Sequence, residues 1–244
     1  MKGKHIKESN NKLIWEIVIL ILIIIFVYSL IQIINWIKSN LELKQLEDNL
    51  FSKVITVETV DEEKKIEIDF DELKSINNEV IGWIKIENTN INYPITQADD
   101  NEYYLKHDIN KKYSVCGNIF LDSKSKSDFL NQNSVIYGHN LKSGGMFADL
   151  RKIYNGDLGD NVYVKIYTPK NEFTYQVIAA YVAEASKEII QSNFTENSKK
   201  QYISNVVRNS KIAFKNDAKS NENMITLITC YGDQRTVVNA LKVD

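Results

Sequence analysis

The 244-residue chain has only two cysteines and three histidines, and this scarcity excludes several kinds of site. Cys116 and Cys230 lie far apart, and no CxxC or HxxxH pair offers the ligands of a closed zinc site, so we expect no metal and no cofactor. Basic residues do not exceed acidic ones, 30 against 32, which argues against a nucleic-acid partner. There is no internal repeat, and the length suits one domain with a good-sized core.

The one long hydrophobic run lies near the N-terminus. Residues 17–31 carry no charge, and apolar side chains dominate from Leu13 to Ile37. About 20 such residues suffice to cross the hydrocarbon core of a bilayer. Trp15 and Trp36 stand near the two ends, where amphipathic rings favour the membrane interface. A cleaved signal peptide is the alternative, but its apolar region is shorter and is followed by small residues. We therefore predict an uncleaved anchor over residues 13–37.

Charge predicts the orientation of this anchor. Residues 1–12 carry four lysines against one glutamate and should stay in the cytoplasm. Residues 38–68 then form a juxtamembrane helix and a linker, and residues 69–244 form an extracytoplasmic domain. Outside the cytoplasm the two cysteines could pair, so a disulfide is one alternative for them.

Short alternating, β-branched segments dominate the extracytoplasmic part. They predict two strands around the turn ENTN within residues 80–97, and further strands within residues 117–122, 133–139, 161–168, 172–184, 223–230 and 235–243. Many short strands joined by polar turns are typical of a closed or nearly closed β-barrel. The fold class is therefore mainly β, with flanking helices and the N-terminal membrane helix.

Four helical segments are expected around these strands. Asp69 can cap a short helix, and residues 101–108 and 146–154 have helical patterns. The clearest helix covers residues 195–212, where Thr195 can act as the cap and Tyr202, Val206 and Val207 fall on one face.

Two of the scarce reactive side chains end hydrophobic strands. His139 follows NSVIYG and Cys230 follows MITLIT, whereas His107 lies in LKHD, where a solvated surface residue is the simpler interpretation. A cysteine and a histidine from separate strand ends are the minimum for thiol nucleophilic catalysis. Arg235 opens the next strand, and the four-residue loop YGDQ can form a hairpin that brings it beside Cys230. A fixed positive charge there would lower the thiol pKa and stabilise an oxyanion. By spacing alone, a small buried apolar cysteine is the competing interpretation.

These elements resemble the sortases, the membrane-anchored cysteine transpeptidases of Gram-positive bacteria. TLITC at residues 226–230 matches the TLxTC motif of that family, YGHN at 137–140 holds its histidine, and an arginine follows on the next strand. Residues 81–108 and 117–122, and the helix near 195–210, are similar to class B sortases. The resemblance covers about residues 70–244.

The resemblance implies an eight-stranded barrel and a two-step reaction. Cys230 would attack the carbonyl after the threonine of a C-terminal sorting signal of the NPxT(N/G) or PxTG type and form a thioester. A peptidoglycan precursor amine would then resolve the thioester. His139 would be the acid and base, and Arg235 would orient the substrate and stabilise the oxyanion. Contacts to the signal peptide carry over to Asn101, Leu105, Tyr137, Ile189, Ile190 and Thr229.

Two other functions compete with this one. A catalytically silent wall-binding module with the same fold would not need to keep the cysteine, the histidine and the arginine together. A papain-type thiol hydrolase expects its cysteine before the histidine and at the start of a helix, whereas here Cys230 follows His139 and ends a strand.

Overall fold

The computed structural model describes residues 4–60, 63–185, 190–215, 222–231 and 233–243. The chain forms two compact units, Met1–Glu47 and Asp48–Asp244. The first unit consists of most of helix α1 (Lys4–Val54), which continues without a break through the predicted anchor and the predicted juxtamembrane helix. Among the described residues, α1 is the one helix that is long and apolar enough to cross a membrane.

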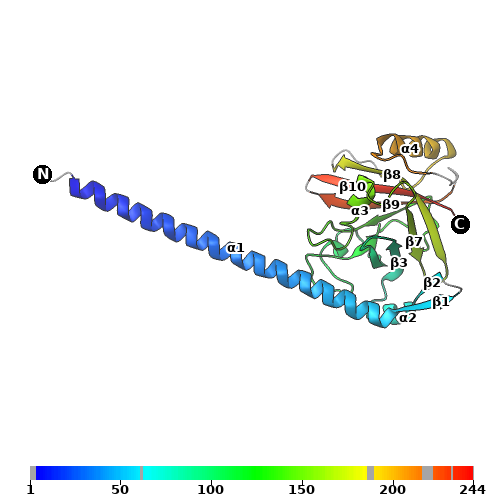
Figure 1. Ribbon diagram of the computed structural model, residues 1–244, viewed down its shortest axis with the longest axis horizontal. Coiled ribbons are helices and arrows are strands. Elements are labelled where there is room, and N and C mark those ends of the chain that lie inside the picture. Colours follow the sequence, from blue (N-terminus) through cyan, green and yellow to red (C-terminus); the bar gives the residue numbers. More distant parts are fainter. Residues whose placement is uncertain (1–3, 61–62, 186–189, 216–221, 232, 244) are drawn as a thin grey trace. The chain divides into compact units, whose positions relative to one another are not determined.

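Eight strands of the second unit close into the predicted barrel (Figure 1). Around the barrel their order is β10-β8-β7-β3-β4-β5-β6-β9, and the pairing of β10 with both β8 and β9 completes the ring. The strands are β3 (Val80–Ile86), β4 (Asn92–Thr96), β5 (Ile119–Leu121), β6 (Asn133–Tyr137), β7 (Tyr163–Tyr167), β8 (Glu172–Glu184), β9 (Met224–Tyr231) and β10 (Gln234–Lys242). Every strand segment predicted from the sequence is confirmed.

The barrel strands are buried to different degrees, and the sequence pattern reflects this. Residues 224–229 of β9 are all buried, which explains why MITLIT is an uninterrupted run rather than an alternation. In β3 the pairing with β4 shifts at Gly82, where a Cβ atom would lie 2.9 Å from the carbonyl oxygen of Tyr167. A glycine is therefore required at this bulge.

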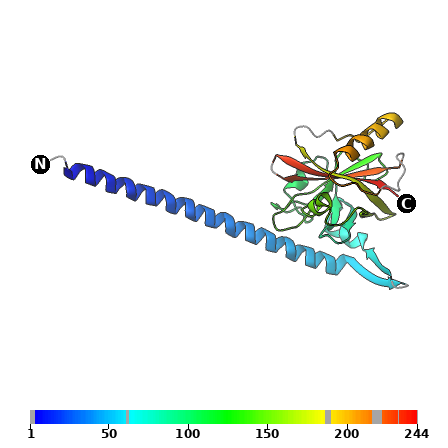
Figure 2. The same cartoon turned by 45° about the horizontal axis from the view of Figure 1, so that its top comes forward.

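Helix α4 (Glu196–Asn209) covers one face of β8, β9 and β10 (Figures 1 and 2). Its start is confirmed, because the Thr195 hydroxyl accepts a hydrogen bond from the backbone N–H of Ser198 in a capping box. Ile203 and Val206 enter the core cluster, whereas Val207 is 44% exposed. The predicted apolar face was therefore wrong at Val207, because the core-facing stripe runs through residues 199, 203 and 206 at helical spacing.

The other helices are short. Asp69 caps α2 (Phe70–Ile76) as predicted, accepting hydrogen bonds from two backbone N–H groups, and α3 is Leu150–Asn155. The segment 101–108 forms only one 3₁₀ turn, η1 (Tyr103–Leu105), rather than a longer helix. The predicted linker contains an antiparallel hairpin of β1 (Ile55–Val60) and β2 (Glu63–Ile68).

Candidate active site

The candidate site lies where the ends of β6, β9 and β10 meet. β6 and β9 run parallel with Tyr137 opposite Ile228, and the backbone N–H of Gly138 donates to the carbonyl of Ile228 at 3.1 Å. Parallel neighbours end at the same edge of a sheet, about 5 Å apart. His139 lies two residues beyond Tyr137, and Cys230 lies two residues beyond Ile228. The strand register therefore brings the backbones of His139 and Cys230 to the same end of the barrel.

The hairpin of β9 and β10 adds Arg235 to this end. Cys230 is paired with Arg235, and the pairing continues to Tyr231 and Gln234, so the predicted hairpin is confirmed. On its other side Arg235 is paired with Ala183 of β8. Only two residues separate β9 from β10, so the predicted loop of four residues was too long, and Arg235 lies directly opposite Cys230 in the pairing.

The guanidinium group of Arg235 is partly buried with an unused donor. Its Nε atom is inaccessible to solvent and has no hydrogen-bond partner within the part of the chain that the structure describes. Buried donors without partners are rare in folded proteins, because each costs about 1–3 kcal/mol. The residue as a whole is only partly buried, so its positive charge lies at the end of the barrel to which Cys230 belongs, where it could stabilise a substrate oxyanion.

The ring of His139 is held by a backbone carbonyl. Its Nε2 atom lies 2.7 Å from the carbonyl oxygen of Leu105, at the end of η1. A carbonyl can only accept, so Nε2 carries the hydrogen in this contact and Nδ1 is left for proton transfer. The carbonyl thus fills the orienting role that an aspartate has in a serine protease triad. Sequence reasoning did not find this partner, because backbone carbonyls leave no residue-type signal.

Tyr137 links the site to an acidic group. Its hydroxyl lies 3.5 Å from Oδ2 of Asp122, and its ring stacks on Phe120 with the centroids 5.3 Å apart. The pKa of Tyr137 is raised to about 12, chiefly by burial and then by the charge of Asp122, while the charge of Arg235 opposes the rise. The phenol therefore stays protonated at neutral pH and is available as a donor.

Asn101 has both ends of its amide engaged within the protein. Nδ2 donates to Oδ2 of Asp122 at 2.7 Å, and Oδ1 accepts from the backbone N–H of Ser123 at 2.8 Å. The amide therefore braces the loop before η1 against the segment after β5. Its contact with a signal peptide stays a prediction.

The remaining residues predicted to contact the signal peptide are Thr229, Ile190 and Ile189. Thr229 is 1% exposed, and Ile190 packs against the core cluster under α4. Ile189 lies outside the described residues. The side chain of Cys230 lies outside them as well, so the disulfide between Cys116 and Cys230 stays an untested alternative. Cys116 itself is 2% exposed.

His107 does not belong to the site. It is half-buried, its ring stacks on Tyr103 with the centroids 4.1 Å apart, and its Nδ1 atom lies 2.8 Å from the carbonyl of the same tyrosine. This is a packing role, and it differs from the solvated position expected from the sequence. Across the described residues, no three histidine, cysteine, aspartate or glutamate side chains gather as metal ligands would.

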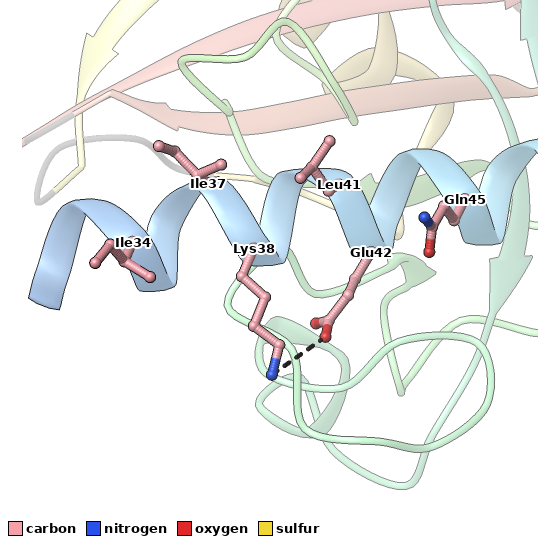
Figure 3. A pocket seen from close by; sticks show the side chains of 6 residues that line it. All are labelled: Ile34, Ile37, Lys38, Leu41, Glu42 and Gln45. Carbon is pink, nitrogen blue, oxygen red and sulfur yellow. Dashed lines mark ion pairs between the residues drawn. The ribbon is translucent and has the colours of Figure 1, made fainter.

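A hollow of about 460 Å³ lies along α1, and its lining residues are far in the sequence from His139, Cys230 and Arg235 (Figure 3). Its lining consists of Ile34, Ile37, Lys38, Leu41, Glu42 and Gln45, and Lys38 forms an ion pair with Glu42 at 3.7 Å. The lining contains no cysteine or histidine, and its two charged side chains, Lys38 and Glu42, are paired with each other. The chemistry therefore belongs to the barrel.

A closed barrel that brings a cysteine, a histidine and an arginine to one end defines a thiol-dependent acyl-transfer enzyme. The sortase domain model matches residues 84–243, and the chain belongs to the sortase family. Within this family it is a class B sortase, and class B sortases are cysteine transpeptidases of the cell surface that act on surface proteins with sorting signals.

Three relatives illustrate this similarity. Sortase B of Staphylococcus aureus is 27% identical over 185 residues, which are 73% of this chain and 72% of that protein. Sortase B of Listeria monocytogenes is 45% identical over 86 residues, 35% of each chain. The crystal structure of Clostridium perfringens sortase B superposes with a TM-score of 0.67 at 32% identity, covering 72% of this chain and all of that one.

Proposed function

We propose that this protein cleaves a C-terminal sorting signal after its threonine and transfers the cleaved protein to an amine of cell-wall peptidoglycan. The observation that carries the proposal is the strand register, which brings the backbones of Cys230, His139 and Arg235 together at the end of β6, β9 and β10. The similarity to sortase B proteins supports the same assignment. A silent wall-binding module has no observation in its favour.

In the first step, the thiolate of Cys230 attacks the threonine carbonyl, and the carbonyl π electrons move to oxygen. The guanidinium group of Arg235, a residue that is only partly buried and is paired with Cys230, donates to that oxyanion. When the tetrahedral intermediate collapses, the C–N bond breaks, and the protonated imidazole of His139 gives its Nδ1 proton to the leaving amine. The product is a thioester on Cys230.

In the second step, the acceptor amine attacks the thioester. Nδ1 of His139 takes the proton that the amine loses, because Nε2 is held by the carbonyl of Leu105. Collapse of the second intermediate forms the new amide and releases the thiolate of Cys230. We assign the binding of the signal peptide to the side chains of Leu105, Tyr137 and Thr229, together with Asn101, Ile189 and Ile190.

The reaction is tested with the full-length protein in detergent micelles, a panel of peptides with NPxTN, NPxTG and PxTG cores, and triglycine as the amine. We expect cleavage after threonine for at least one core, a peptide adduct on Cys230 in intact-mass spectra, and a triglycine-linked product. A peptide that is cleaved at another bond, or without any adduct on Cys230, would contradict the proposed mechanism.

We also propose that residues 13–37 anchor the protein, with residues 1–12 in the cytoplasm and residues 69–244 outside. The length and composition of α1 support this, as do the lysines of the first twelve residues. Protease added to intact protoplasts should digest the barrel and leave a tag at the N-terminus protected. Release of a shortened barrel into the medium would indicate a cleaved signal sequence instead.

A further inference from the structure

We propose that Tyr104 is a positioning residue for His139 and acts through the carbonyl group of Leu105. The proposal rests on the proposed role of His139 as the acid and base of the reaction. Tyr104 belongs to a hydrogen-bond network next to η1, and none of the side chains in this network is part of the catalytic motif.

The phenol of Tyr104 is fixed on two sides. The residue is fully buried, its hydroxyl donates to Oε2 of Glu79 at 2.6 Å, and it accepts from Nδ2 of Asn77 at 2.8 Å. Lys111 donates to the other carboxylate oxygen of Glu79 at 2.7 Å, and Asn77 also donates to the carbonyl of Ile109 at 2.9 Å. Each member of the network therefore has a defined partner.

The protonation states of this network are also defined. Burial raises the pKa of Tyr104, and its hydrogen bond to Glu79 raises it further. Burial alone would raise the pKa of Glu79, but the hydrogen bonds from Lys111 and Tyr104 and the charge of Lys111 outweigh burial and lower it. At neutral pH the tyrosine is therefore the donor and the glutamate the acceptor, and the hydroxyl has one orientation.

This anchored ring determines where the carbonyl of Leu105 lies. Tyr104 is the middle residue of η1 and directly precedes Leu105, and its own carbonyl accepts from the backbone N–H of Asn118 at 2.9 Å. Two consecutive carbonyls are thus committed, the first to Asn118 and the second to Nε2 of His139 at 2.7 Å. A shift of the tyrosine would move the acceptor of the histidine.

Gly117 closes the same arrangement from the other side. Its φ is +59°, and a Cβ atom there would lie 2.6 Å from the carbonyl oxygen of Tyr104 and 2.9 Å from both Cδ2 of His139 and the carbonyl oxygen of Leu105. The backbone of Gly117 therefore packs directly against the turn and the imidazole. Only a residue without a side chain leaves both in place.

The consequence for catalysis is the selection of one imidazole tautomer. While the Leu105 carbonyl is fixed, the hydrogen of the neutral ring stays on Nε2 and Nδ1 remains the reactive nitrogen. A displaced carbonyl would allow the ring to rotate and to populate the second tautomer, in which Nδ1 carries the hydrogen and cannot accept a proton. The network thus acts on the rate of proton transfer more than on peptide binding.

The test replaces the hydroxyl alone. In the full-length protein in detergent, Tyr104→Phe keeps the buried ring, and Glu79 and Asn77 keep their contacts with Lys111 and Ile109. We expect kcat to fall about tenfold, as a small misplacement of a catalytic group does, with a smaller change in KM for the peptide. We also expect the ¹⁵N spectrum of the His139 ring to change from a single Nε2–H tautomer to a mixture. The matched control is Tyr113→Phe, since that side chain is 72% exposed and loses the same hydroxyl, and its kcat should equal that of the parent.

Two results would overturn the proposal. One is a Tyr104→Phe protein with the kcat of the parent, and the other is a lower kcat with the tautomer of His139 unchanged, which would indicate general loosening. Glu79→Gln, at a partly exposed position, provides a second variant if Tyr104→Phe does not fold, and it should change the tautomer in the same direction. Cleavage that persists in Cys230→Ala would instead refute the proposed function itself, whatever Tyr104→Phe shows.

Discussion

Cys230→Ala is expected to reduce signal-peptide cleavage to background and to remove the thioester adduct. The loss should be roughly 10⁴- to 10⁶-fold, as for hydrolases deprived of their nucleophile, because neither His139 nor Arg235 can form the covalent intermediate. The measurement is peptide cleavage by the full-length protein, followed by chromatography, together with the intact mass of the enzyme after incubation with substrate.

The matched control for this loss is Cys116→Ala. Cys116 is the other cysteine of the chain, is 2% exposed, and lies outside the three converging strand ends. Its removal should leave cleavage within about twofold of the parent, because the proposed mechanism needs one nucleophilic thiol and Cys230 supplies it. Equal losses in both variants would indicate a structural pair of cysteines and would refute the role of Cys230 as nucleophile.

Arg235→Ala is expected to slow the reaction by about 10²- to 10³-fold in kcat, or about 2.7–4 kcal/mol, the cost of removing an oxyanion-hole donor. The physical reason is the position of its guanidinium group, which belongs to the partly buried residue that is paired with Cys230. In a site of low dielectric such a donor acts on developing charge far more strongly than it would in water. The fall should be in kcat, with a smaller change in KM.

Two variants separate charge from geometry at this position. Arg235→Lys keeps the positive charge but loses the planar fork, and we expect it to recover only a small part of the activity. Arg208→Ala removes an arginine from the exposed surface of α4 and should have no effect. Unchanged turnover in Arg235→Ala would mean that another group holds the oxyanion.

Local sequence signals were sufficient for the elements of the fold. Alternation and β-branching located the strands, and the turn ENTN separates β3 from β4, with Asn88 at a φ of +61°. The caps Asp69 and Thr195 were also predictable, because capping depends on a side chain and on backbone N–H groups only two or three residues away. Signals of this kind are contained within a few residues of chain.

Predictions that depended on tertiary packing were less accurate. Val207 has the residue type of a core position but is exposed, because β8 and β10 meet α4 along the stripe of Ile203 and Val206. Residues 101–108 have a helical composition, yet only η1 forms, because the chain then turns and His107 pairs with Tyr113. At Val207 strands distant in sequence decided the outcome, whereas at residues 101–108 a bridge to a residue six positions further along the chain decided it.

One part of the candidate site could be predicted because it is local in the sequence, and the other part depends on contacts between distant segments. The hairpin that pairs Cys230 with Arg235 is local, so TLITC and a short loop predicted it. The meeting of Cys230 with His139 depends on the parallel pairing of β6 with β9, two strands separated by about 90 residues. The contact of His139 with the Leu105 carbonyl has no residue-type signal at all.

By itself, then, the sequence determined the membrane-length helix, the strands, the helix caps, and the cysteine and arginine of one hairpin, since each depends on neighbours along the chain. Only the tertiary structure decided that β6 and β9 pair in parallel, that the buried Nε of Arg235 meets no partner among the described residues, and that Tyr104 fixes the carbonyl that holds His139. These features depend on contacts between segments that are far apart in the sequence, and such contacts leave no local pattern. The strand pairing adds to this, because it consists of backbone hydrogen bonds, and backbone groups are the same in every residue except for the missing donor of proline.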